Sequence, residues 1–319
     1  MTSRVGEVRR ERRAGKGVLG GAMGEGAAKR WLWQTARASP EALAAIAGRR
    51  PAVVVAGGSR GIGRAIAERF AAAGHRIVLI GRDQQALADT AEAIGGHGGG
   101  GVTCFALDLV APDAAARVAA HLMVEGLYLD ILVLNAGIGL AGAFADADRS
   151  DLEALVALNV TATTRLLNAF LPELLARAGG GILVVSSLGA YFPGPYQAAY
   201  YASKAYQVAL VTGIAHEVAS RGVRLAVVAP GPVDTGFHAA MGAECALYRR
   251  VWPAMTPRAV AAAAYRGYRL GHRVIVPGAF NGLAASIAGL VPQRLAARIV
   301  ATLLWPGGNG GGKARDAEN

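Results

Sequence analysis

Short apolar runs alternate with segments of helical periodicity from Pro51 to about Pro277. The runs are continuous and rich in Val, Ile and Leu, as in parallel strands that are buried on both faces. The alternation predicts a doubly wound α/β fold, with a seven-stranded parallel sheet in a single domain. The seven expected strands are 52–57, 76–81, 102–108, 130–137, 181–187, 223–230 and 273–277.

The segments that flank this domain differ from it in character. Residues 1–26 form a Gly- and Arg-rich leader that we expect to be flexible, because it has little apolar surface to bury. Residues 27–50 are expected to be a helical extension in which Trp31 and Trp33 pack. The remaining boundaries are 51–277 for the central domain, 278–306 for an apolar helical extension and 307–319 for a flexible tail.

The C-terminal extension, residues 278–306, has an amphipathic pattern that Pro292 divides. It is too interrupted and too charged to predict a bilayer-spanning helix. Three placements stay open: peripheral contact with a membrane, contact with a partner subunit, or packing against its own domain.

The net charge of +11 is concentrated near the N-terminus, because residues 1–50 hold 11 Lys and Arg but only 4 Asp and Glu. The leader could contact acidic lipid or nucleic acid, and deletion of residues 1–25 would then abolish that binding. It could equally be a solvated tail, or upstream sequence if translation starts at Met23 rather than Met1. The modest charge of the body argues against nucleic acid as a partner.

The two cysteines, Cys104 and Cys245, lie far apart and outside any C-x-x-C or His/Cys cluster. This usage argues against a disulfide framework and against a zinc site, so we expect no metal. It fits a reducing compartment, and we predict a cytoplasmic protein, with peripheral membrane contact left open.

The segment "AGGSRGIG" (56–63) joins the first expected strand to the first expected helix. Gly57, Gly61 and Gly63 allow a tight turn and a close approach of the backbone to a pyrophosphate, which then rests on the N-terminus of the helix. In this strand–turn–helix context the loop predicts a dinucleotide site.

The spacing G-x-x-x-G-x-G resembles that of the short-chain dehydrogenase/reductase family, and later motifs agree in order over about residues 51–277. "NAG" (135–137) is similar to the family's N-N-A-G, with Leu134 in place of the first Asn, and "PGPVDT" (230–235) is similar to the segment around the nicotinamide. Ala56 departs from the family's usual Thr. The missing hydroxyl removes a hydrogen bond that braces the turn, which implies weaker cofactor binding.

The resemblance implies roles for individual residues. Asp108 would contact the adenine ring, and the Val233 backbone and Thr235 would contact the carboxamide. The implied catalytic residues are Asn159, Ser187, Tyr200 and Lys204. The implied cofactor-binding residues are Gly57, Ser59, Arg60, Gly61, Ile62, Gly63, Arg82, Asp108, Asn135, Ala136, Gly137, Tyr200, Lys204, Pro230, Gly231, Val233 and Thr235.

Two adjacent tyrosines precede Lys204 in "AAYYASKAYQ" (198–207). Only Tyr200 fits the family's Y-x-x-x-K, and the serine expected thirteen residues earlier is then Ser187. Ser186 should point the other way, because side chains alternate along a strand. Tyr201 is interpreted as a packing or interface residue.

The chemistry of carbonyl reduction explains these residue types, because hydride addition places negative charge on oxygen that must be stabilised and protonated. Tyr200 would donate the proton, Ser187 would hydrogen-bond the carbonyl oxygen, and Lys204 would bind the ribose hydroxyls. We expect the Lys204 ammonium, together with the positive charge of the nicotinamide in the oxidised complex, to lower the Tyr200 pKa. By resemblance, Asn159 would hold a water that relays protons to Lys204.

Two arginines favour NADP(H) over NAD(H), because a 2′-phosphate needs cationic contacts whereas an NAD ribose needs a carboxylate. Arg60 lies in the glycine loop, and Arg82 follows Gly81 at the end of the second strand. The carboxylate of Asp83 instead favours NAD(H), unless Asp83 caps the next helix.

The variable substrate loop of the family would cover about residues 236–256, where apolar and aromatic side chains predominate. These side chains would line a pocket for a hydrophobic carbonyl or secondary alcohol, or would only pack the loop. The sequence therefore predicts an NADPH-dependent carbonyl reductase or alcohol dehydrogenase, in a homodimer or homotetramer. The alternative is a non-catalytic NADP(H)-binding sensor or scaffold.

Overall fold

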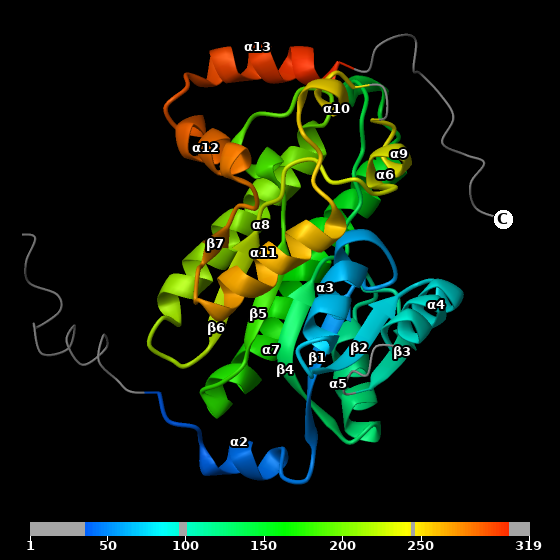
Figure 1. Ribbon diagram of the computed structural model, residues 1–319, viewed down its shortest axis with the longest axis vertical. Coiled ribbons are helices and arrows are strands. Elements are labelled where there is room, and N and C mark those ends of the chain that lie inside the picture. Colours follow the sequence, from blue (N-terminus) through cyan, green and yellow to red (C-terminus); the bar gives the residue numbers. More distant parts are fainter. Residues whose placement is uncertain (1–35, 96–100, 244–245, 306–319) are drawn as a thin grey trace, which may run out of the picture.

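The computed structural model describes residues 36–95, 101–243 and 246–305. Its centre is a seven-stranded parallel sheet in the order β3-β2-β1-β4-β5-β6-β7, as the sequence predicts (Figure 1). The order reverses between β1 and β4, and in open α/β sheets ligands bind at such a switch point, outside the carboxyl ends of the strands. The strands are β1 (Arg50–Ala56), β2 (Arg76–Gly81), β3 (Val102–Ala106), β4 (Leu127–Leu134), β5 (Gly181–Val185), β6 (Arg224–Val228) and β7 (Val274–Ile275).

Strand boundaries differ most at β4. We expected it over 130–137, but it begins at Leu127, where Leu127 and Leu129 are already buried, and it ends at Leu134. The following residues leave the sheet because the Asn135 and Ala136 N–H groups both donate to the Ala56 carbonyl. The "NAG" motif is therefore a turn at the carboxyl edge of the sheet, not the end of a strand.

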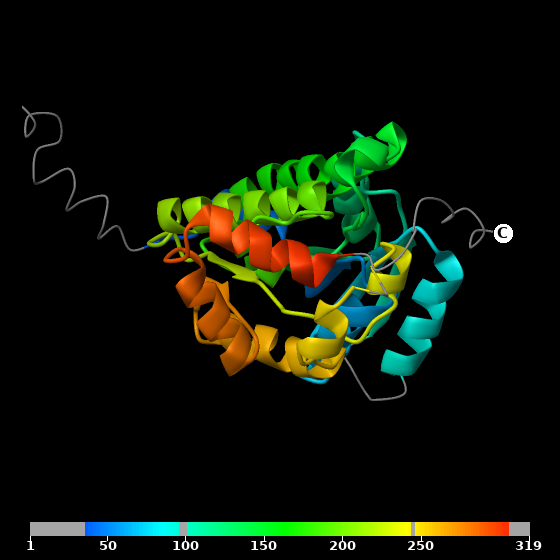
Figure 2. The same ribbon diagram turned by 90° about the horizontal axis from the view of Figure 1, so that it is seen from above.

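Two helical layers cover the sheet (Figure 2). One apolar cluster joins the sheet to α5 (Ala114–Val124), α7 (Thr163–Arg177) and α8 (Ala198–Glu217). A second cluster on the opposite face joins it to α3 (Gly61–Ala71), α4 (Gln84–Gly95) and α11 (Pro257–Arg269). Burial on both faces explains why the strands read as unbroken apolar runs.

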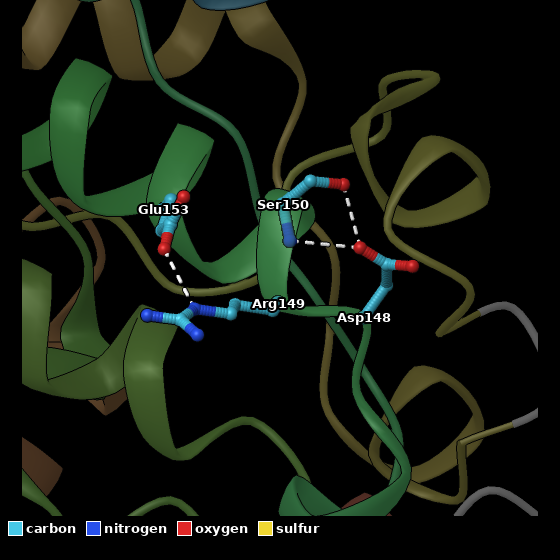
Figure 3. A network of polar contacts seen from close by, with 4 residues as sticks. All are labelled: Asp148, Arg149, Ser150 and Glu153. Atoms are coloured by element: carbon cyan, nitrogen blue, oxygen red, sulfur yellow. Dashed lines mark hydrogen bonds and ion pairs between the residues drawn. The ribbon is translucent and has the colours of Figure 1, made fainter.

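Polar contacts fix the start of α6 (Arg149–Val156), shown in Figure 3. The Asp148 carboxylate caps the helix by accepting hydrogen bonds from Ser150 N (2.7 Å) and Ser150 Oγ (2.5 Å). Arg149 pairs with Glu153 one turn later, at 2.9 Å. A defined start matters because α6 continues through a π-helical turn, η2 (Ala157–Ala162), which carries Asn159.

The continuous helical run from Arg149 to Arg177 is, within the described ranges, the one helix whose length and apolar content would allow it to cross a membrane. In this structure Leu166, Leu167 and Phe170 of that run are buried against the sheet. The run therefore serves as a core helix of the fold.

The flanking segments are only partly described. Trp31 and Trp33 lie outside the described residues, as does the glycine-rich segment 96–100. In the part of the expected helical extension that the structure describes, the chain forms the short α2 (Pro40–Ala45), and β1 already begins at Arg50.

Beyond β7 the chain forms α12 (Ala279–Ala288) and α13 (Gln293–Leu304), which Pro292 separates as expected. The short helices η1 (Phe144–Asp146), η3 (Leu188–Tyr191), α9 (Phe237–Ala240) and α10 (Tyr248–Val251) lie in connections. Figure 1 shows α12 and α13 in orange and red at the carboxyl end of the sheet.

Candidate active site

The glycine loop after β1 is shaped by two contacts that leave no room for side chains. Gly57 has φ +79°, and a Cβ there would lie 2.7 Å from the Ala136 nitrogen. A Cβ on Gly63 would lie 1.9 Å from the Gly57 carbonyl oxygen. The loop therefore folds tightly against the first turn of α3, whose free N–H groups suit a phosphate.

Long-range hydrogen bonds brace this loop. Asn135 Nδ2 donates to the Gly57 carbonyl (2.8 Å). The buried Thr90 Oγ1 of α4 donates to the Ser59 carbonyl (2.8 Å). Sequence reasoning missed Thr90, whose hydroxyl supports the loop from α4, while the family's usual Thr is replaced by Ala56.

The charged residues at the end of β2 bear on the choice of nucleotide. Asp83 Oδ1 accepts a hydrogen bond from Ala86 N (3.0 Å), so its carboxylate caps the N-terminus of α4. Arg64 pairs with Glu68 at 2.8 Å. Neither Arg60 nor Arg82 takes part in an ion pair with any residue of the described ranges, and both line the cleft.

The central side chains of the site come from β5 and α8. Ser187 follows β5, and its Oγ accepts a hydrogen bond from Gly189 N (3.1 Å). Ser186 Oγ instead donates to the Lys204 backbone carbonyl (2.8 Å), so its hydroxyl is turned onto α8. Lys204 Nζ lies 5.8 Å from the Tyr200 ring centroid and donates to the Val185 carbonyl (3.1 Å).

Burial dominates the electrostatics of this group. It raises the pKa of Tyr200 to about 12, although a hydrogen bond with Ser187 acts in the opposite direction. Burial also lowers the pKa of Lys204 to about 8. Among the groups of the chain itself, removal of the phenol from water outweighs the stabilising contacts, so the neighbouring Lys204 does not by itself lower the Tyr200 pKa. The contribution expected from the charge of an oxidised nicotinamide stays a prediction.

Asn159 lies below the cleft in the π-helical turn and is fully buried. Its Nδ2 donates to the Ile138 carbonyl (2.8 Å) and to Ser203 Oγ (3.0 Å), and its Oδ1 accepts from Ile138 N (3.0 Å). The side chain thereby fastens the turn after β4 to α8. π-Helical turns of this kind occur frequently at functional sites.

Gln207 is a buried polar residue that the sequence analysis did not single out. Its Nε2 donates to the Asn159 backbone carbonyl (2.9 Å), and its Oε1 accepts from Lys204 Nζ (3.2 Å). One amide thus links the two groups between which we expected a relaying water. Its position one turn after Lys204 was visible in the sequence, but its partner is 48 residues away.

The aromatic ring of Tyr201 packs against the chain at Gly189 and Gly194. A Cβ on Gly194 would lie 2.2 Å from the Tyr201 Cγ, and one on Gly189 would lie 3.0 Å from its Cζ. The two glycines therefore make room for the ring, which also meets Tyr200 edge-on at 6.1 Å.

The 230–235 segment closes the far side of the site. The Pro230 carbonyl accepts from Leu188 N (2.7 Å), and Val233 pairs with Met255 in an isolated parallel bridge. Sequence reasoning missed Asn281 of α12, against which Gly231 is packed without room for a Cβ. Asn281 Oδ1 accepts from Trp252 Nε1 (2.8 Å), and its Nδ2 donates to the Pro277 carbonyl (2.7 Å).

The expected substrate loop is partly described. Phe237 packs against Tyr200 with ring centroids 5.6 Å apart, and Met241 joins the same apolar cluster. The loop also carries a polar pair, since Tyr248 Oη and His238 Nδ1 are 2.7 Å apart. The wall is therefore less uniformly apolar than its composition suggests.

These elements enclose one continuous cleft of about 1740 Å³. Every predicted site residue lines it except Gly63 and Asn159, which lie beneath its surface. Its glycine cradle, helix N-terminus and arginines fit a nicotinamide dinucleotide. No cluster of three potential metal-ligating side chains occurs among residues 36–95, 101–243 and 246–305.

Comparison with known proteins agrees with this geometry. The model of the short chain dehydrogenase family matches residues 51–246, so the chain belongs to this family of oxidoreductases. An uncharacterised oxidoreductase of Staphylococcus saprophyticus is 33% identical over 182 residues, which cover 57% of this chain and 78% of that protein. Other curated relatives are longer, and the matched region covers as little as 33% of them.

Solved structures share the fold. A short-chain dehydrogenase from Sphingobium yanoikuyae in complex with NADPH has a TM-score of 0.66 and 29% identity, covering 75% of this chain and 94% of its own. A metagenomic short-chain oxidoreductase in complex with NADP has a TM-score of 0.60 and 32% identity, covering 72% and 97%. A Burkholderia phymatum protein in complex with NAD has a TM-score of 0.67 and 23% identity, covering 75% and 93%.

Proposed function

We propose that this oxidoreductase is an NADPH-dependent carbonyl reductase, or the same enzyme working as a secondary-alcohol dehydrogenase, acting on a hydrophobic substrate. The observation that carries the proposal is the meeting of Ser187, Tyr200 and Lys204 in one cleft with the glycine cradle. The bound nucleotide would supply the hydride to a ketone or accept it from an alcohol.

The chain's own residues then have distinct tasks. Tyr200, neutral below a pKa of about 12, donates its proton to the carbonyl oxygen as negative charge develops there. Ser187 donates a hydrogen bond to the same oxygen. Lys204, held by the Val185 carbonyl and Gln207, directs its remaining proton toward the ribose hydroxyls.

The nucleotide would be held by the glycine loop and α3, with Asp108 at the adenine and Val233 and Thr235 at the carboxamide. Arg60 and Arg82 support NADP(H) over NAD(H), because both line the cleft and the competing carboxylate of Asp83 is engaged as a helix cap. Two solved structures above 25% identity, at 29% and 32%, are complexes with NADPH and NADP, and this also supports the choice.

The hydrophobic substrate class is supported by the walls beside Tyr200. Phe237 and Met241 lie on one side, and Ile287, Ile299 and Leu303 of the C-terminal helices line the same cleft. Such a surface favours a bulky ketone or alcohol over a small polar one.

Fluorescence titration of the purified protein with NADPH and, separately, with NADH tests the proposal. We expect NADPH to bind at least tenfold tighter, a difference of about 1.4 kcal/mol, and the Arg60→Ala/Arg82→Ala variant to lose this preference. Equal or NADH-favoured binding would overturn the NADP(H) assignment. NADPH binding without turnover of any apolar ketone would instead favour the sensor or scaffold.

A further inference from the structure

The helices α12 and α13 expose large apolar side chains and bury small ones. On α12, Phe280, Leu283 and Ile287 follow one another at helical spacing, with exposed fractions of 56%, 61% and 44%, and Leu290, two residues after the helix, is 82% exposed. The buried residues of the same helix are Asn281, Ala284 and Ala288. A helix that only packed on its own domain would show the reverse pattern.

The second helix continues this surface. Leu295 and Ile299 of α13 are each 51% exposed, and Trp305, directly after the helix, is 55% exposed. The residues that α13 buries are Ala296, Val300 and Leu304. Both views show α12 and α13 on the outside of the molecule, with α13 lying across the carboxyl end of the sheet (Figures 1 and 2).

The charge around this surface has one sign. Residues 245–315 contain no Asp or Glu. Two exposed arginines, Arg294 and Arg298, stand next to Leu295 and Ile299 and have no ion-pair partner among the described residues. A basic, apolar helical surface with a terminal Trp matches the chemistry of the interface of an anionic bilayer.

We propose that α12 and α13 form a docking surface for an anionic membrane, with the exposed apolar residues inserted among the acyl chains and Arg294 and Arg298 at the lipid headgroups. The charge argues against a second copy of the chain as the occupant. A symmetric dimer would place this face against itself, bringing like charges together with no acidic residue of the surface to pair them.

The same two helices form part of the cleft. Ile287, Val291, Ile299 and Leu303 line it, so the docking surface continues into the substrate wall, and Ile287 and Ile299 belong to both. A membrane-bound molecule would therefore hold this wall of its cleft at the bilayer. Docking itself does not depend on the proposed reaction, so the two can fail separately.

Flotation of the full-length protein with phosphatidylcholine vesicles, with and without phosphatidylglycerol, tests the proposal. Binding is expected only to the anionic vesicles and should weaken with added salt. The variant Arg294→Gln/Arg298→Gln should bind about 30-fold more weakly, from the usual contribution of two arginines near an anionic surface. The variant Leu283→Ser/Leu290→Ser should bind the vesicles at least tenfold more weakly, because two apolar side chains are no longer available to insert among the acyl chains.

Matched controls separate this surface from general charge and apolarity, including that of the basic N-terminal residues. Arg37→Gln/Arg221→Gln removes two arginines elsewhere, and Met123→Ser/Val124→Ser removes two exposed apolar residues of the α5 terminus; both should bind as the parent protein does. Unchanged binding of the α12 and α13 variants would overturn the proposal. So would a dimer in light scattering that Leu283→Ser/Leu290→Ser dissociates, with no vesicle binding by the parent.

Discussion

The side-chain amide of Gln207 donates a 2.9 Å hydrogen bond to the backbone carbonyl of Asn159 and accepts one from Lys204 Nζ at 3.2 Å. The lysine is thus connected to the π-helical turn by a group that cannot readily pass on a proton. Gln207 is a positioning residue for Lys204, and it bears directly on the lysine's protonation.

Replacement of Gln207 by Glu should move the pH profile of the enzyme. Lys204 has a pKa of about 8, so activity that needs its ammonium form should fall as the pH rises through that value. A carboxylate beside Nζ favours the ammonium and raises the pKa, so the fall should occur at higher pH in Gln207→Glu. The measurement is kcat/KM against pH, with Gln293→Glu on α13 as the control. An unmoved midpoint would argue that Gln207 is only structural.

Replacement of Tyr200 and replacement of Tyr201 should have different effects on kcat. Tyr200→Phe removes the proton donor and is expected to lower kcat by about 10²–10⁴ while nucleotide binding persists. Tyr201→Phe keeps the ring that Gly189 and Gly194 accommodate, and its turnover should stay within a few-fold of the parent enzyme. Equal losses in both variants would show that the assignment to Tyr200 is wrong.

Replacement of Lys204 by Met should stabilise the nucleotide-free protein at neutral pH while abolishing activity. Burial lowers the lysine pKa from 10.5 to about 8, so holding the ammonium in the folded state costs about 3 kcal/mol below pH 8. Between these values the unfolded chain binds the extra proton, so the parent protein gains stability as pH rises. The advantage of Lys204→Met, measured by urea unfolding, should therefore shrink as the pH is raised above 8. A difference in unfolding free energy between Lys204→Met and the parent protein that stays the same at all pH values would contradict this prediction.

A methyl group in the glycine loop should close the nucleotide site. In Gly63→Ala the new Cβ would overlap the Gly57 carbonyl and approach Asn135 Nδ2, so the loop must shift at a cost of about 1–3 kcal/mol in stability. NADPH affinity should fall at least tenfold. Gly95→Ala, at the end of α4 with no atom near its Cβ, is the matched control and should bind normally. Normal titration of Gly63→Ala would exclude the loop as the pyrophosphate site.

The sheet could be predicted because its information is local. Each strand is an unbroken apolar run, and a run buried on both faces needs no partner to be recognised; β2 matches its prediction residue for residue. The end of β4 could not be placed in the same way. It depends on the Ala56 carbonyl, which draws Asn135 and Ala136 away from the sheet and belongs to a strand far earlier in the chain.

In the candidate site, too, features set by local sequence could be predicted and features set by distant residues could not. Residues in fixed motifs, such as Tyr200 with Lys204, were recognisable from their spacing. The roles of Thr90, Gln207 and Asn281 depend on partners brought close only by folding, 29 to 48 residues away. The raised pKa of Tyr200 also follows from burial, which a short segment does not specify.

The amide of Asn281 ties Trp252 to α12 and to the Pro277 carbonyl, while Gly231 packs against it. The Asn281 side chain thereby closes residues 252–281 into a loop. Because one amide holds both ends of this closed loop, we expect the two ends to open together. Backbone amides around Trp252 and along α12 should therefore exchange their hydrogens with solvent at one common opening free energy, and a single substitution, Asn281→Ala, should uncouple them.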